Sequence, residues 1–299
     1  MIKKVFFRIL PLITFFLLFP CIGGAREIAP IVSTDWLQTN IGNPQLIVLD
    51  IRRVEDYREG HIPGAISSFY GGWAYKQGEL YSEIPEKDDL EDLISSLGIS
   101  LKRWVVVAGD TDTPRHSYQS ARVACTLQYA GIENVALLDG GMNKWISEKK
   151  PLSTEIVRIK DKPFKGNFNK EKMFADKEYI LKRMGEIILL DVREPEFFAG
   201  TKKLDCIPKR GRIPGAFNLP TSCAFNEDCT YKSKEKLKEI AESAAGSDRN
   251  VEIVTYCDIG HCCPTWAYIL KHLLGYKNVR IYDGAMQEWM QDSQAPLTR

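Results

Sequence analysis

A cysteine-rich turn near the end of the chain carries the residue types best suited to covalent chemistry. Residues 255–263 read TYCDIGHCC, so Cys257 follows an apolar run and precedes a segment with helical spacing. A loop at the start of a helix turns backbone N–H groups inward and stabilises an anion. We therefore expect Cys257 to have a lowered pKa and to react as a thiolate, the nucleophilic form of cysteine. Gly260 gives the loop access to the positive φ that a tight cradle often requires.

Other functions of this turn remain open from the residues alone. Cys257 could be structural, or it could form a disulfide with Cys262 or Cys263, and either neighbour could act as its redox partner after oxidation. His261 could hold the Cys257 thiolate, lend it a proton, or face solvent. A metal site is disfavoured, because zinc sites commonly use two separated pairs of ligands and these residues crowd into one turn.

The remaining cysteines suggest structural roles. Cys223 and Cys229 lie in a polar stretch and are candidates for a structural disulfide, with Cys206 as an alternative partner. The pairing among these three and Cys262 and Cys263 stays open. Cys125 lies in an apolar stretch and is expected to be a small buried side chain.

The elements that must position this turn occur twice in the chain. Residues 49–65 read LDIRRVEDYREGHIPGA, and LDVREPEFFAG at 190–200 with RIPGA at 212–216 repeats the pattern. IENVALLDGGMNKW at 132–145 likewise corresponds to YKNVRIYDGAMQEW at 276–289. The sequence thus predicts a domain at 30–150, a linker at 151–170 and a second domain at 171–299.

Each copy alternates strand and helix signals. Short apolar runs at 46–49, 104–108, 187–190 and 251–256 are typical of strands buried on both faces, and segments of helical periodicity separate them. We predict an α/β fold of two tandem domains, each a mostly parallel sheet with helices on both faces. Trp145 and Trp289 occupy equivalent positions and are expected to close the two cores.

The first 25 residues differ from the rest of the chain. Lys3 and Lys4 precede an apolar run at 9–19, and small residues at 23–25 offer a cleavage site. This pattern predicts a signal peptide at 1–25 and export to the periplasm. The run is about half the length of a membrane-spanning helix, so no strong membrane signal is expected after cleavage. Lipid anchoring through Cys21 is the alternative.

Composition excludes some classes of partner. The chain has 299 residues, with 40 basic and 39 acidic side chains spread along it. No broad field directs it to nucleic acid or to anionic membranes.

The chain resembles the rhodanese family in four features taken together. These are the two LD-x-R segments, the IPGA turns, the strand that ends in cysteine and the YDGAMQEW segment. The similarity is strongest to bacterial members of the tandem thiosulfate and 3-mercaptopyruvate sulfurtransferases. It implies that a loop holds a persulfide on the catalytic Cys257, with the substrate-binding loop residues Asp258, Ile259, Gly260, His261 and Cys262. It further implies transfer of sulfur from a small donor such as thiosulfate to a thiol or cyanide, without a cofactor.

The first copy departs from this pattern and is expected to be catalytically silent. Gly109 aligns with Cys257, and the loop from Asp110 to Ser120 is expected to be about four residues longer. The resemblance extends to the segment Ser120, Ala121 and Arg122. It implies that this domain forms one wall of the active-site cleft.

The second copy departs from the family as well. Many relatives have a basic residue where this chain has Asp258, and an acidic group at the mouth of the site should oppose a dianionic donor. Arg193 could offset that charge by binding an anionic substrate group, or it could form a buried pair with Asp191 or Glu196. A sulfur carrier, redox sensor or partner-docking module is therefore the alternative to an enzyme. A related phosphatase is disfavoured, because Cys263 stands where those enzymes have arginine.

If the chain is exported, another exported protein is a further candidate partner.

Overall fold

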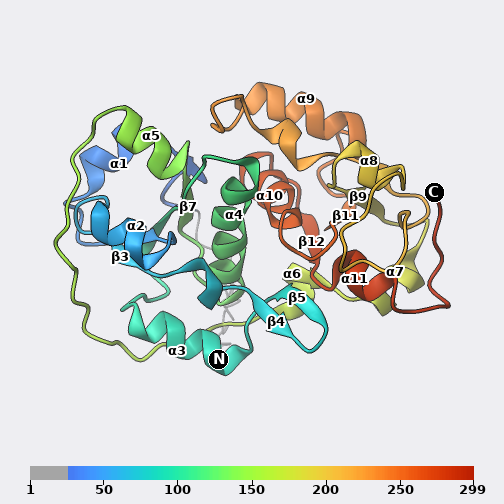
Figure 1. The fold of residues 1–299 in the computed structure, drawn as a ribbon, viewed down its shortest axis with the longest axis horizontal. Coiled ribbons are helices and arrows are strands. Elements are labelled where there is room, and N and C mark those ends of the chain that lie inside the picture. The colour runs from blue at the N-terminus through green and yellow to red at the C-terminus, as the bar shows by residue number, and fades with distance from the viewer. Residues whose placement is uncertain (1–25) are drawn as a thin grey trace, which may run out of the picture.

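The computed structural model describes residues 26–299, which form two α/β domains side by side (Figure 1). The expected signal peptide and Cys21 lie outside the described residues. No helix in the described part of the chain is both long and apolar enough to cross a membrane.

The first domain is built on a five-stranded parallel sheet of order β1-β7-β6-β2-β3. Its strands are β1 (Ile31–Val32), β2 (Leu46–Asp50), β3 (Ile66–Ser67), β6 (Trp104–Ala108) and β7 (Val135–Leu138). Its helices are α1 (Thr34–Asn40), α2 (Val54–Glu59), α3 (Lys87–Ser96), α4 (Pro114–Tyr129) and α5 (Gly141–Ser147), with a 3₁₀ turn η1 (Tyr70–Gly72). An antiparallel hairpin of β4 (Tyr75–Gln77) and β5 (Leu80–Glu83) extends from this domain.

The second domain repeats the topology with the sheet order β10-β9-β11-β12-β8, again all parallel. Its strands are β8 (Phe174–Ala175), β9 (Ile188–Asp191), β10 (Phe217–Asn218), β11 (Glu252–Tyr256) and β12 (Asn278–Tyr282). Its helical segments are α6 (Lys170–Met173), α7 (Lys177–Arg183), α8 (Pro195–Phe198), η2 (Thr221–Ala224), α9 (Lys234–Ala245), α10 (Cys263–Tyr268), η3 (Ile269–Leu273) and α11 (Ala285–Trp289). The predicted fold class is confirmed: each domain has a mostly parallel sheet flanked by helices.

Both faces of each central strand are buried, which explains the continuous apolar runs in the sequence. Successive side chains of a strand point to opposite faces. In β6, Val106 packs into an outer core of the first domain, while Val105 and Val107 face the other way. In β11, Val254 packs into the corresponding outer core of the second domain.

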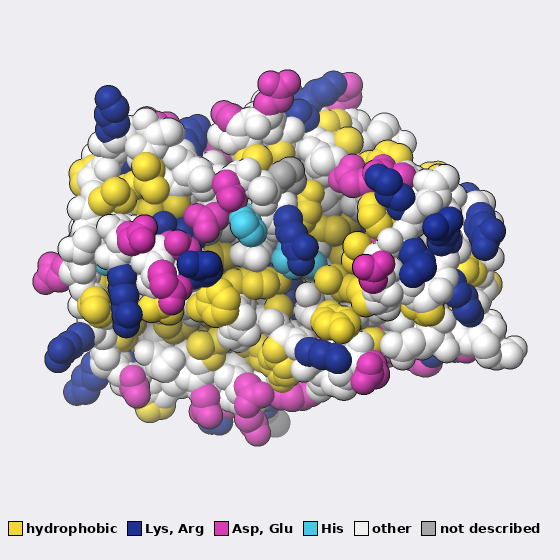
Figure 2. All heavy atoms as spheres, in the orientation of Figure 1, with side chains coloured by type: hydrophobic (Ala, Val, Ile, Leu, Met, Phe, Trp, Pro, Cys, Tyr) yellow, Lys and Arg dark blue, Asp and Glu magenta, His cyan; other side chains and the backbone are white. Residues whose placement is uncertain are grey.

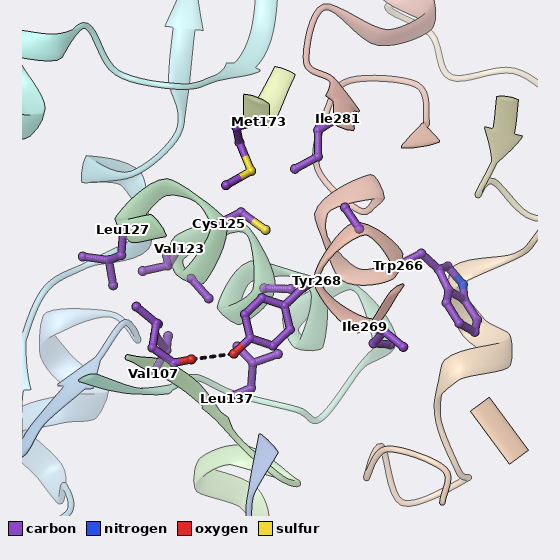
Figure 3. Close-up of a cluster of buried hydrophobic side chains, with 14 of the residues drawn as sticks. Val107, Val123, Cys125, Leu127, Leu137, Met173, Trp266, Tyr268, Ile269 and Ile281 are labelled. Atoms are coloured by element: carbon purple, nitrogen blue, oxygen red, sulfur yellow. Dashed lines mark hydrogen bonds between the residues drawn. The ribbon is translucent and has the colours of Figure 1, made fainter. Parts of the chain in front are cut away.

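The inner faces of both sheets share one hydrophobic core, so the two domains are packed as a unit. Cys125 on α4 lies in this core together with Trp266 and Ile269 from the helical segment after β11 (Figure 3). Tyr268 lies in the same cluster, and its hydroxyl oxygen is 2.6 Å from the carbonyl oxygen of Val135 in the first domain. This core brings the N-terminal end of α10 against the first domain.

The outer cores end in the same way in both domains. Trp145 and Trp289 are buried, and each indole N–H donates a hydrogen bond of 2.9 Å to a proline carbonyl, at Pro151 and Pro296 respectively. Residues 154–169 between the domains contain no helix or strand, and the Asn167 backbone N–H bonds to the first domain. On the face shown in Figure 2, acidic and basic side chains are interspersed.

Candidate active site

Cys257 lies where the central strand of the second sheet ends. β11 ends at Tyr256 and α10 begins at Cys263, so residues 257–262 form the connecting loop. The carbonyl oxygens of Cys257 and Asp258 accept hydrogen bonds of 3.0 and 2.9 Å from the backbone N–H groups of Met286 and Gln287. The loop is thereby fixed against α11, and the side chain of Cys257 is almost fully enclosed, at 1% exposure.

The surroundings of Cys257 favour a thiolate. Burial by itself raises the pKa of Cys257, but hydrogen bonds from the thiols and backbone N–H groups of Cys262 and Cys263 hold that pKa well below its usual value. The bond to Cys257, together with burial, raises the pKa of Cys262. Burial and the same thiolate raise the pKa of Cys263. The loop therefore presents one thiolate flanked by two protonated thiols.

Arg193 forms the buried pair with Asp191 that was one of its predicted roles. Its Nε and Nη2 donate to the two Asp191 carboxylate oxygens at 2.9 and 2.6 Å, and Nη2 also donates to the Gly211 carbonyl oxygen at 2.9 Å. Its Nη1 donates to Asp258 at 3.0 Å. These four bonds use four of the five guanidinium N–H groups, so at most one N–H, on Nη1, is left for a substrate anion. Glu196 pairs with Lys202 instead.

Asp258, expected from the sequence as an acidic group near the mouth of the site, is largely buried and paired with Arg193. Its side chain faces Arg193, and the residue is only 8% exposed. Burial raises the pKa of Asp258 to about 6, although the Arg193 charge opposes that shift. Asp258 therefore lines the loop, and the Arg193 guanidinium partly neutralises its charge.

His261 is buried at 9% exposure, so the solvent-facing role considered from the sequence is wrong. Its Nδ1 lies 3.1 Å from the Tyr70 hydroxyl and its Nε2 lies 3.2 Å from the Arg115 carbonyl oxygen. Because a carbonyl can only accept, Nε2 carries the hydrogen and Nδ1 accepts from Tyr70. Burial lowers the pKa of His261, so the ring is neutral. Both ring nitrogens bind the first domain, which leaves neither for proton exchange with Cys257.

The rest of the loop is shaped by close packing. Gly260 has φ +73°, and a Cβ atom there would stand 2.7 Å from the Asp283 carbonyl oxygen. Ile259 packs against the outer core of the second domain. The structure therefore brings Asp258, Gly260 and Cys262 around Cys257, whereas Ile259 contributes to the core.

The first domain has the same framework without the nucleophile. Gly109 occupies the position of Cys257, and its carbonyl oxygen accepts a 2.9 Å hydrogen bond from Met142 N–H, as Cys257 does from Met286. Arg52 pairs with Asp50 and with the Gly60 carbonyl oxygen, each at 2.7 Å from Nη2. This framework holds no thiol at its centre.

The expected longer loop in the first domain is not formed. The loop before α4 spans only residues 109–113. The additional residues lengthen the helix, because α4 has 16 residues whereas α10 has 6 and η3 adds 5. Thr113 caps α4 by accepting from His116 N–H, and Pro114 stands at the first helical position. This is a favourable helix start that stops the loop from extending.

All seven cysteines in the described part of the chain are free thiols. The expected disulfide of Cys223 and Cys229 is therefore not formed. Cys223 lies on η2 against the shared core, and Cys229 lies in a turn with φ +59°. Cys125 is buried, and burial raises the pKa of its thiol to about 12. Residues 26–299 contain no group of three or more His, Cys, Asp or Glu residues that could hold a metal ion.

Sequence reasoning missed several residues that fix the loop from outside. Gln287 and Asp283 follow β12, and Tyr70 belongs to the first domain. Arg122 was noted only as part of a matching segment, yet it forms an ion pair with Asp283. None of these contacts is local, so no sequence spacing could have found them.

Two copies of one α/β fold, with a buried cysteine at the carboxyl end of the central strand in the second copy only, define a tandem-domain protein with one candidate nucleophile of this kind. Family comparison agrees: a Rhodanese-like domain model matches residues 33–148 and 176–292. The chain belongs to the rhodanese family.

Named relatives place the chain among the rhodanese-type sulfurtransferases. It is 33% identical to the "Sulfur carrier protein TtuD" of Thermus thermophilus over 87% of this chain and 93% of the relative. It is 31% identical to a Mycolicibacterium smegmatis protein named "Putative thiosulfate sulfurtransferase", over 89% of this chain and 96% of that one. The fold also matches SseA from Escherichia coli, described as a 3-mercaptopyruvate sulfotransferase, with a TM-score of 0.73 and 24% identity, covering 86% of this chain and 99% of SseA.

Proposed function

We propose that the chain transfers a sulfane sulfur from thiosulfate or a similar small donor to a thiophilic acceptor through a persulfide on Cys257. One observation carries this proposal: of the two equivalent loops, 109–113 and 257–262, the second alone begins with a cysteine, and that cysteine is buried at the end of the central strand. Its surroundings also hold the pKa of Cys257 well below its usual value. A thiolate at a strand end, enclosed by N–H and S–H donors, is suited to attack on electrophilic sulfur.

The proposed reaction has two displacements. The Cys257 thiolate attacks the outer sulfur of the donor, an S–S bond forms, and the bond inside the donor breaks, so that sulfite leaves when the donor is thiosulfate. The acceptor, a thiol or cyanide, then attacks the terminal sulfur of the persulfide, and Cys257 returns as the thiolate. Donors of the 257–262 loop stabilise the negative charge at both stages. No electron acceptor or cofactor is needed for this sequence.

Cyanide-dependent formation of thiocyanate from thiosulfate tests the proposal. We expect the Cys257→Ser variant to form none, while Cys125→Ser, a change of another buried thiol that faces the Pro264 carbonyl oxygen outside the 257–262 loop, stays near the wild-type rate. Both variants should fold, because serine is nearly isosteric with cysteine. Thiocyanate formation by Cys257→Ser would refute the proposed nucleophile.

A sulfur carrier that loads but does not turn over rapidly is the second candidate. The engagement of Arg193 by Asp191 and Asp258 favours it, since at most one N–H of that guanidinium, on Nη1, is left for an anionic donor. A relative at 33% identity is also named a sulfur carrier protein. A stable persulfide that forms once and passes to a protein thiol, without repeated thiocyanate formation, would distinguish this candidate from the enzyme.

We also propose that Cys262 or Cys263 protects Cys257 during oxidation. Both thiols donate to the Cys257 sulfur. Attack of either thiol on a Cys257 sulfenic acid would form a disulfide and release water. Peroxide treatment of the Cys262→Ala and Cys263→Ala variants should reveal which thiol is used. An unchanged yield of internal disulfide in both would refute this role.

For localisation, the pattern of residues 1–25 supports the proposal of export to the periplasm, where the sulfur acceptor could be another exported protein. Cell fractionation, with the mass of the mature N-terminus, tests this and separates cleavage from lipid attachment at Cys21.

A further inference from the structure

One buried ion pair joins the silent domain to the loop of the reactive cysteine. Arg122 lies on α4 of the first domain and is only 1% exposed. Its guanidinium pairs with the Asp283 carboxylate, which follows β12 of the second domain, through Nη1–Oδ1 and through Nη2–Oδ2 at 3.2 Å. A buried charge pair of this kind is costly to break, because the remaining partner is left uncompensated.

The same guanidinium contacts the backbone on both sides of the domain interface. Nη2 donates to the Ser82 carbonyl oxygen in the β4–β5 hairpin at 2.6 Å. Nη1 lies 3.4 Å from the Gly260 carbonyl oxygen within the Cys257 loop. Arg122 therefore links the hairpin, Asp283 and the loop in one contact network.

Asp283 connects its ion pair with Arg122 to the Cys257 loop. Its carboxylate accepts a 3.0 Å hydrogen bond from the backbone N–H of Ile84 in the first domain. Its carbonyl oxygen is packed so closely on Gly260 that a Cβ atom there would stand at 2.7 Å. A shift of Asp283 would consequently move the loop.

A second contact from the hairpin supports the same loop. The side-chain amide of Gln287 accepts from Tyr81 N–H at 2.8 Å and donates to the Tyr81 carbonyl oxygen at 2.9 Å. The backbone N–H of Gln287 in turn donates to the Asp258 carbonyl oxygen at 2.9 Å. With the bond from Tyr70 to His261, the first domain reaches the loop at three residues.

We propose that Arg122 of the silent domain is a positioning residue that holds the Cys257 loop in its reactive conformation. It does not touch the sulfur, and acts through Asp283 and Gly260. The backbone N–H groups and thiols that stabilise the Cys257 thiolate belong to the two residues after His261, so their direction depends on how the loop is held. The silent domain thus takes part in the reactive site by fixing the Cys257 loop, in addition to lining it.

The pH profile of Cys257 alkylation by iodoacetamide, followed by peptide mass spectrometry, tests this proposal. We expect Arg122→Met to shift the profile toward higher pH by about one unit, which is a roughly tenfold slower reaction at pH values below the pKa of Cys257 in both proteins. Arg122→Lys, which restores a positive charge, should recover part of the rate. Arg52→Met removes another buried arginine of the first domain, one that pairs with Asp50 within that domain, and should leave the profile unchanged.

A variant with an uncompensated Asp283 could fail to fold, so Arg122→Met/Asp283→Asn is measured beside it. The double variant is neutral at both positions and should show the same shift. A wild-type profile in either folded variant would overturn the proposal. Alkylation requires no sulfur donor, so this result stands whether or not the proposed sulfurtransferase activity is found.

Discussion

Replacing Gly260 by alanine measures how closely the Cys257 loop is packed against Asp283. The residue has φ +73°, a region that costs an L-amino acid about 1–2 kcal/mol. The new Cβ would stand 2.7 Å from a backbone carbonyl oxygen, which has little freedom to move. Relief of such a clash by shifts of the surroundings costs about 1–3 kcal/mol. We therefore expect Gly260→Ala to lower the free energy of unfolding by about 2–5 kcal/mol.

Gly275→Ala is the matched control. Gly275 lies in the same domain with φ +78°, but a Cβ atom there would have no heavy atom within 4 Å. Only the backbone penalty of about 1–2 kcal/mol applies. Urea unfolding gives both free energies, and persulfide loading gives the consequence for the site. Gly260→Ala should load much more slowly and Gly275→Ala at the wild-type rate. Equal destabilisation by the two changes, with normal loading in both, would refute the packing argument.

Three further predictions test the electrostatics and the silent domain. Arg193→Met and Arg52→Met each leave a buried carboxylate unpaired and should lower the free energy of unfolding in urea by about 3–5 kcal/mol. Only Arg193→Met should alter the alkylation rate of Cys257. Equal effects of both on that rate would contradict the assignment of Arg193 to the Cys257 site. Burial raises the pKa of Asp258 to about 6, above its unfolded value, so the stability that this group contributes is present at low pH and lost as pH rises through 6. Relative to Asp258→Asn, the wild-type protein should lose about 2 kcal/mol between pH 4 and pH 7, and parallel pH–stability curves would exclude the shift. The Gly109→Cys variant should gain no persulfide at residue 109. It should be destabilised by about 1–3 kcal/mol, because the new Cβ would stand 2.9 Å from a neighbouring hydroxyl oxygen. Sulfur loading at that position would show that the first domain lacks only its nucleophile.

The fold could be predicted from the sequence because its signals are local and occur twice. Apolar runs such as 104–108 are buried on both faces, and the repeated segments lie at equivalent places in the two sheets. The position of Cys257 between a strand and a helix could be predicted for the same reason. The positive φ of Gly260 follows from the need for a tight loop between those elements.

Contacts between distant residues could not be predicted in the same way. The partners of His261 lie in the first domain, and the Asp283 partner of Arg122 is 161 positions along the chain. Asp258 carries a charge that is visible in the sequence, but its neutralisation by Arg193 depends on how two strand ends meet in the sheet. The start of α4 is a different case, because Thr113 followed by proline is a local helix-start signal that could have corrected the predicted loop length.

The most direct test of the central claim is the intact mass of the reduced protein before and after incubation with a sulfane donor, and again after cyanide. The proposed function predicts a gain of one sulfur atom on Cys257, its removal by cyanide, and no gain in Cys257→Ser. The same gain in Cys257→Ser, or none in the wild-type protein with thiosulfate, alkyl persulfide or polysulfide, would contradict a persulfide mechanism at this cysteine.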